Sequence, residues 1–140
     1  MYDHDGDVPR PFAHIGNTIL MEYIGAKEQC APRLSDVILA EEEAQPLFDC
    51  ILRNIELALV HGRIHGDLSE YNILYWEGKV SLIDFAQAVD PYHNSDVFSL
   101  FARDITRVCR HFALYNIPCD PEELARAIWT SHMGPIPELI

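Results

Sequence analysis

Basic residues are scarce in this 140-residue chain: ten lysines and arginines stand against 22 aspartates and glutamates, and the formal net charge is −12. A protein that holds nucleic acid by its own electrostatics needs a basic surface, because clustered cations neutralise the phosphate backbone. The charge balance therefore argues against direct binding of nucleic acid by this chain.

Long hydrophobic runs are lacking as well. No apolar stretch approaches the roughly 18 residues that a membrane span requires, so we expect no membrane association. Residues 1–7 are acidic and polar, unlike either a secretory signal or a transit peptide. These absences predict a cytoplasmic protein.

Cysteine is sparse and carries no metal-site spacing. None of the four cysteines belongs to a C-x-x-C pair, and Cys109 and His111 are too close in sequence for a usual zinc-ligand pair. We therefore expect reduced, mostly buried thiols in a cytosolic protein. The expectation covers Cys30, Cys50, Cys109 and Cys119.

The chain does have enough apolar residues, 49% of the total, to form the core of one domain. Leucines and isoleucines at positions 47, 51, 55 and 59 recur every four residues and predict a helix over about 44–60. Apolar residues three or four apart predict a second helix over about 95–115, and Asp120 followed by Pro121 predicts the start of a third. The expected fold class is α+β, mainly helical with small β-hairpins.

The remaining segments predict the hairpins and loops. Residues 72–76 and 79–83 are two short strand-like runs joined by Glu77-Gly78, which suits a tight turn. Asn17 to Tyr23 is a β-prone apolar run. Residues 1–16, rich in Asp, Gly and Pro, are expected to be irregular, and residues 26–33 to form a loop.

The most informative residues are Asp67, Asn72 and Asp84. The stretch R-I-H-G-D-L-S-E-Y-N-I-L covers residues 63–74, and L-I-D-F covers 82–85. Phosphoryl transfer needs a carboxylate at the attacking hydroxyl and hard oxygen ligands that hold Mg²⁺ against the phosphates. A loop that carries Asp67 and Asn72, followed by a hairpin that returns to Asp84, brings three such side chains together. Each residue alone is equally compatible with a turn or capping role, but the ordered set favours catalysis.

This order resembles the catalytic loop and metal-binding aspartate of protein kinases. Gly66 stands where conventional kinases have arginine, and Ala86 stands where they have the glycine of Asp-Phe-Gly. The H-G-D form also occurs in aminoglycoside and choline phosphotransferases, so the loop alone leaves these classes open.

The flanking segments resemble RIO-type atypical serine/threonine kinases. L-S-E-Y-N at 68–72 is similar to their L-S-E-x-N loop, and L-I-D-F-A-Q-A at 82–88 to their I-D-F-P-Q segment, with Ala86 in place of the usual proline. Further similarities are Arg103-Asp104, I-L-M-E-Y-I-G at 19–25 and A-P-R-L at 31–34. The Arg103-Asp104 segment and Ser69-Glu70 argue against an aminoglycoside-type phosphotransferase.

The resemblance implies a protein-kinase-like C-terminal lobe that uses ATP and Mg²⁺. It implies that Asp67 is catalytic, that Asn72 and Asp84 bind Mg²⁺, and that Asp84 is also a candidate phospho-acceptor. Glu22 and Ile24 would form the hinge to adenine. His65 and Asp104 are expected to orient and brace the loop rather than to react. The implied partners are a protein substrate or a ribosomal-subunit precursor, and the choice between kinase and ATPase stays open.

The family layout also divides the chain. Residues 1–16 would be the remnant of an N-terminal lobe, 17–25 the hinge strand and 26–140 the C-terminal lobe. The sequence contains no G-x-G-x-x-G loop and no strand lysine that would grip phosphates. We therefore expect the isolated chain to be poorly active without such a lobe. The alternative is a non-catalytic kinase-fold binding module, similar to a pseudokinase and associated with ribosomes.

Overall fold

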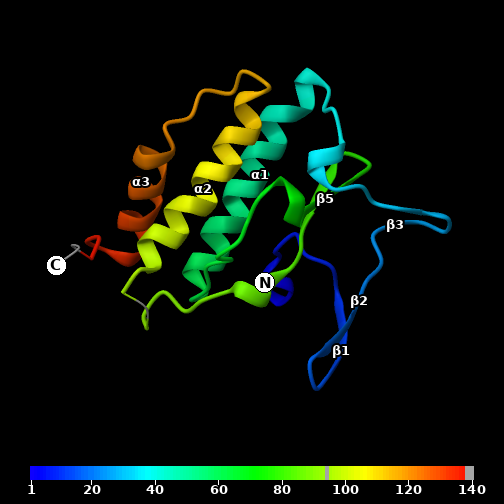
Figure 1. Cartoon of the computed structure of the whole chain (residues 1–140), viewed down its shortest axis with the longest axis horizontal. Helices are drawn as coiled ribbons and strands as arrows, with labels where there is room; N and C mark the ends of the chain where they lie inside the picture. Colours follow the sequence, from blue (N-terminus) through cyan, green and yellow to red (C-terminus); the bar gives the residue numbers. More distant parts are fainter. Residues whose placement is uncertain (94, 138–140) are drawn as a thin grey trace.

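The computed structural model describes residues 1–93 and 95–137, so positions 94 and 138–140 of the predicted C-terminal lobe lie outside the described residues. Three helices lie side by side (Figure 1): α1 (Glu41–Val60), α2 (Val97–Ala113) and α3 (Pro121–Met133). The side chain of Asp120 accepts hydrogen bonds from the first backbone N–H groups of α3, which confirms the predicted helix start. In the described part of the chain, no helix is both long and apolar enough to cross a membrane.

The core lies between these helices and a small hairpin. Leu47, Ile51, Ile55 and Leu59 of α1 are all buried, as their four-residue spacing predicted. The apolar face of α2 is buried too, and the rings of Phe48 and Phe112 pack with their centroids 5.3 Å apart. The helix predictions are confirmed, with boundaries that differ by at most three residues.

The predicted hairpin is β5 (Ile73–Trp76) paired antiparallel with β6 (Lys79–Leu82), in a register that places Ile73 opposite Leu82. Glu77 and Gly78 both have positive φ, as a two-residue turn of this kind requires. Short 3₁₀ turns flank it: η3 (Glu70–Asn72) precedes β5, and η4 (Phe85–Gln87) follows β6. The hairpin therefore carries the chain from the 63–72 loop to Asp84.

The N-terminal segment is not irregular throughout, so that prediction was wrong. Residues 1–16 contain η1 (Tyr2–His4) and β1 (Pro11–Ile15), and β1 pairs with β2 (Thr18–Met21). The predicted loop at 26–33 contains a second small hairpin, β3 (Gly25–Ala26) with β4 (Gln29–Cys30), and η2 (Leu34–Asp36) follows.

The β1–β2 hairpin projects away from the helices (Figure 1), and every residue of its two strands is exposed. A strand with no buried face has no need of alternating apolar and polar residues, so the usual sequence signal is absent. Pro9 and Pro11 also favoured an irregular segment over a strand in the sequence-based prediction. The strand expected over 17–25 is only four residues long.

Asp7 holds the N-terminal segment against the body of the domain. Its carboxylate accepts hydrogen bonds from the Asn54 amide (2.7 Å) and the Cys50 thiol (3.3 Å) and pairs with Arg53, all on α1. Its carbonyl accepts from the Leu82 N–H at 2.8 Å. Residues 1–11 are thereby fixed next to the end of β6, where they help to line a cavity.

The prediction of four free thiols was wrong for one pair. Cys109, near the end of α2, and Cys119, just before α3, form a disulfide. Cys50 is half-buried and Cys30 is exposed, and both are free. The ten-residue spacing of Cys109 and Cys119 gave no indication that they pair, because only the turn between α2 and α3 brings their Cα atoms to 5.9 Å.

Candidate active site

Asp104 of α2 anchors the loop that carries Asp67. Its carboxylate accepts hydrogen bonds from the N–H groups of Gly66 (2.8 Å) and Leu68 (2.9 Å), one to each oxygen. The side chain is 1% exposed, and this burial raises the pKa of Asp104 although both hydrogen bonds favour the carboxylate. Arg103 donates to the Gly66 carbonyl from the same helix. The predicted bracing role of Asp104 is confirmed.

Gly66 is required by the local backbone. Its φ is +82°, and a Cβ at this position would lie 2.6 Å from the carbonyl oxygen of Gln87. Any larger residue would push the 63–72 loop away from the segment that follows Asp84. The departure from the conventional kinase arginine therefore has a steric reason here.

His65 links the loop to the end of the hairpin. Its Nε2 lies 2.8 Å from the Ile83 carbonyl oxygen, and its Nδ1 lies 3.3 Å from the Asp67 N–H. These partners assign the proton to Nε2, which donates, while Nδ1 accepts. The imidazole also packs against the Phe85 ring, with centroids 4.6 Å apart. His65 thus orients the loop, as predicted, and it also bonds the segment that leads to Asp84, which was not predicted.

Asp67 is half-exposed at the mouth of the loop, with a side-chain exposure of 48%. Arg107 of α2 donates a hydrogen bond of 2.7 Å to its Oδ1. This bond lowers the pKa of Asp67 below the usual value for an aspartate, even though partial desolvation acts in the opposite direction. The Arg107 contact thus stabilises the carboxylate form of Asp67.

Asn72 and Asp84 are brought close to Asp67. The Asn72 amide nitrogen donates to the Asp67 carbonyl at 2.8 Å, and the Asn72 carbonyl accepts from the Ile83 N–H at 2.9 Å. Asp84 follows in a left-handed conformation (φ 62°, ψ 64°), which aspartate tolerates better than most residues. All three side chains line one polar cavity of about 540 Å³. The convergence expected from the sequence is present.

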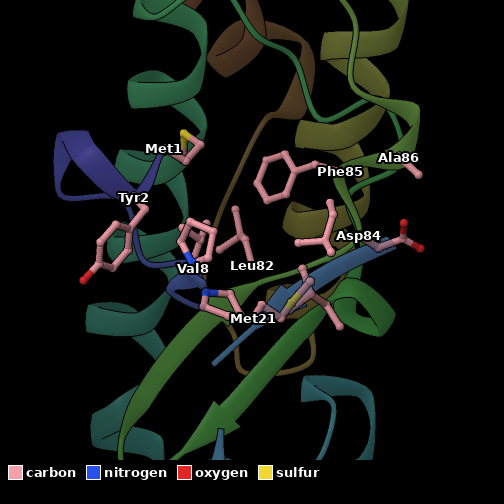
Figure 2. A pocket seen from close by; sticks show the side chains of 12 residues that line it. Met1, Tyr2, Val8, Met21, Leu82, Asp84, Phe85 and Ala86 are labelled. Atoms are coloured by element: carbon pink, nitrogen blue, oxygen red, sulfur yellow. The ribbon is translucent and has the colours of Figure 1, made fainter. Parts of the chain in front are cut away.

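A second cavity of about 440 Å³ lies beside the first and is mostly apolar. In Figure 2, Tyr2 and Asp84 stand on opposite sides of this cavity, with Val8 and Leu82 between them. Met21 of β2 also lines it. Asp84 belongs to the walls of both cavities, and it is therefore the junction between an apolar space and a polar one.

Glu22 and Ile24, the predicted hinge residues, line neither cavity, although the preceding Met21 lines the apolar one. The Glu22 N–H donates to the Arg10 carbonyl at 2.7 Å, and the Ile24 carbonyl accepts from the Ala31 N–H at 2.9 Å. Within residues 1–93 and 95–137, the Glu22 carbonyl and the Ile24 N–H make no hydrogen bond. Their role as contacts to adenine stays a prediction.

Comparison with protein families gives a match to the RIO domain over residues 1–124. The chain belongs to the RIO family. The Rio1 serine/threonine kinase of Thermoplasma acidophilum is 35% identical over 120 residues, which cover 86% of this chain and 61% of that protein. The Rio2 kinase of Methanocaldococcus jannaschii is 38% identical over 118 residues, 84% of this chain and 43% of that protein. The chain thus spans less than two thirds of the length of each of these RIO relatives.

A solved RIO structure shares the fold. The crystal structure of the Rio2 kinase from Chaetomium thermophilum, in an ADP/Mg²⁺-phosphoaspartate complex, superposes with a TM-score of 0.69 at 23% identity. The match covers 89% of this chain and 40% of that one. The expected α+β fold of a RIO kinase lobe is confirmed, and family membership decides against the aminoglycoside phosphotransferase class.

Two residues that line the polar cavity were missed in the sequence. Arg107 and Arg110 of α2 line the polar cavity together with residues of the 67–72 loop. A signal was available, because Arg103, Arg107 and Arg110 have i, i+4, i+7 spacing and so share one face of a helix. The sequence could not show that this face meets the loop.

Proposed function

We propose that this chain carries the ATP- and Mg²⁺-binding half of a RIO-type phosphoryl-transfer site. One observation carries the proposal: Asp84 lies at the junction of an apolar cavity and a polar cavity that also holds Asp67 and Asn72. A nucleoside triphosphate has a matching arrangement of apolar and charged parts, with a flat apolar base at one end and charged phosphates at the other.

The apolar cavity suits the adenine base. Its lining includes Val8, Met21, Leu82 and Phe85, and its volume is in the range of small-ligand sites. The Glu22 carbonyl and the Ile24 N–H next to β2 are an acceptor and a donor without partners among the described residues. Adenine presents a donor and an acceptor on one edge, but Glu22 and Ile24 lie outside the lining of this cavity, so their hinge role stays a prediction.

The polar cavity suits Mg²⁺. The Asn72 side chain donates through its amide nitrogen to the Asp67 carbonyl, and its amide oxygen has no hydrogen-bond partner among the described residues. Asp84 adds a carboxylate. In the described ranges no group of three or more His, Cys, Asp or Glu side chains could hold a metal ion alone. Two protein oxygens fit a Mg²⁺ that keeps waters and binds phosphates. When bound, the ion would neutralise charge on the phosphates.

Asp67 is the proposed base. Its ionised carboxylate would take the proton of a serine or threonine hydroxyl as that oxygen bonds to the γ-phosphorus and the bond to ADP breaks. In the ATPase alternative, an Asp84 oxygen attacks the γ-phosphorus, ADP leaves, and water later hydrolyses the acyl phosphate. The phosphoaspartate in the Chaetomium thermophilum Rio2 complex supports testing this second route. Trapping with hydroxylamine distinguishes them, since it cleaves an acyl phosphate but not a phosphoserine.

The experiment is calorimetric titration of the 140-residue chain with ADP, with and without Mg²⁺. We expect affinity weaker than about 1 μM because no glycine-rich loop or strand lysine contributes, and we expect it to depend on Mg²⁺. Asp84→Asn should abolish the Mg²⁺ dependence, and Asp67→Asn should retain it. Asp49→Asn on the exposed face of α1 is the control. Equal nucleotide binding in all variants, or none in the wild type, would refute the proposal.

Asparagine is the right replacement at position 84, because alanine tolerates the left-handed backbone less well. A fusion that places the N-terminal lobe of a RIO relative before Val8 tests turnover. Asp67→Asn should remove most of it.

A non-catalytic binding module is the second candidate. The observation that favours it is the exposed apolar surface of β1 and β2, where Phe12, Ile15, Ile19 and Leu20 are each more than half exposed. If this surface alone carries function, a double variant of Asp67 and Asp84 would keep all partner binding. A ribosomal-subunit precursor as partner and a cytoplasmic location both stay proposals.

A further inference from the structure

Helix α2 presents three arginines to the catalytic loop in a strongly acidic protein. Arg103, Arg107 and Arg110 are three of only ten basic residues in the chain. Arg103 donates to the Gly66 carbonyl and so belongs to the anchoring of the loop. The other two line the polar cavity beside Asp67, where they could meet a ligand.

Arg107 and Arg110 have unused hydrogen-bonding capacity. A guanidinium has five N–H donors, and Arg107 uses one of them on Asp67. In the part of the chain that the structure describes, Arg110 makes no ion pair and no side-chain hydrogen bond. Acidic residues are more than twice as common as basic ones, so an exposed arginine that has no partner among the described residues is available to an anionic ligand beside the proposed reacting groups.

The position of this pair fits the acceptor rather than the nucleotide. Asp84, the wall shared with the apolar cavity, would hold the metal and phosphates on one side of the polar cavity. Arg107 bonds the carboxylate of Asp67, the group that would face the attacking hydroxyl. An anionic group attached near that hydroxyl would therefore come within reach of the two guanidinium groups.

We propose that Arg107 and Arg110 form an anion subsite that selects acceptor segments with a negatively charged side chain next to the serine or threonine. This inference rests on the proposed function, because it takes Asp67 as the acceptor-side base. The charged side chain is a carboxylate or a phosphate, both of which arginine binds with paired N–H donors. The acidic remainder of the surface repels such segments elsewhere, so the subsite also sets where they dock.

The test uses the 140-residue chain and short fluorescein-labelled peptides with one serine, measured by fluorescence anisotropy. The serine is flanked by glutamate, by phosphoserine or by glutamine, which is the uncharged isostere. The glutamate peptide should bind about five-fold tighter than the glutamine peptide, and phosphoserine about ten-fold tighter. A preference for phosphoserine alone assigns the subsite to phosphate, and an equal preference for glutamate assigns it to anions in general.

Arg110→Gln should reduce the preference to less than about two-fold, and Arg107→Gln should reduce it in the same direction. Arg126→Gln is the matched control, because Arg126 is also exposed and helical but pairs with Glu122 on α3. Equal affinity for all peptides, or a preference that survives Arg110→Gln or is lost equally in Arg126→Gln, would overturn the proposal.

The same variants are titrated with Mg-ADP. If Arg110→Gln weakens Mg-ADP binding and leaves the peptide preference intact, the arginines serve the nucleotide and the subsite is refuted. If the wild type shows the peptide preference but binds no Mg-ADP, the proposed nucleotide function fails while the anion subsite stands. The two failures are therefore distinguishable.

Discussion

The Nη1 atom of Arg107 lies 2.7 Å from the Oδ1 atom of Asp67. This pair joins α2 directly to the carboxylate predicted to act as the base, and the hydrogen bond lowers the pKa of Asp67. We predict that Arg107→Gln raises this pKa toward the usual value for aspartate and that Arg107→Lys restores part of the shift. Carbon-13 NMR titration of the Asp67 carboxyl measures it.

The sign of the pH effect follows from the lowered pKa. A carboxyl with a lower pKa in the folded state contributes stability above its unfolded pKa, and this contribution is lost as pH falls through the folded value. Arg107→Gln should thus flatten the stability profile below about pH 4. Because Asp67 is half-exposed, solvent screening keeps the effect small. An unchanged Asp67 titration in Arg107→Gln would contradict the assignment.

Asp104→Asn should destabilise the domain by about 1–3 kcal/mol. An asparagine amide has one acceptor oxygen, so one of the two backbone N–H groups now bonded to Asp104 would face another donor in a buried site. Urea denaturation measures the loss. Asp3→Asn, at an exposed position, should change stability by less than about 0.5 kcal/mol. Equal stability of the two variants would show that Asp104 does not brace the loop.

Gly66→Ala should be far more costly than Gly16→Ala. Both glycines have positive φ, but no atom of the described residues lies within 4 Å of a Cβ built at Gly16, whereas one at Gly66 would lie 2.6 Å from the Gln87 carbonyl. Backbone strain alone costs about 1 kcal/mol at Gly16, and the added overlap should bring Gly66 to about 3 kcal/mol. Thermal or urea unfolding compares them, and similar losses would mean that the segment after Asp84 yields easily.

His111 should make the fold sensitive to mild acid. It is buried on α2, and burial lowers its pKa from the usual 6.5, although the charge of Glu70 acts in the opposite direction. The unfolded chain therefore takes up a proton that the fold resists, so stability is full above about pH 6.5 and falls as pH is lowered. His111→Leu should remove much of the loss between about pH 7 and 5. His14→Leu, at an exposed position, should leave it unchanged, and the reverse pattern would refute this reading.

Local patterns were enough to predict several elements. The four-residue spacing from Leu47 to Leu59 predicted α1, because a helix that buries one face needs apolar residues at three- or four-residue intervals. Glu77-Gly78 predicted the β5–β6 turn because few residues accept positive φ. Where burial was absent, as in β1, prediction failed for the same reason, since an exposed strand imposes no pattern.

The sequence by itself determined that Asp67, Asn72 and Asp84 would converge, because a short loop and one hairpin connect them and leave little freedom. Only the tertiary structure decided what surrounds them. The packing of α2 against the loop placed Arg107 on Asp67, and the tether of Asp7 to α1 brought the N-terminal segment over the end of β6. The disulfide between Cys109 and Cys119 likewise depends on the turn between two helices. Two of these contacts join residues that are distant in sequence, and the disulfide depends on the path of a turn. The spacing of side chains along the chain does not encode which helix face meets which loop.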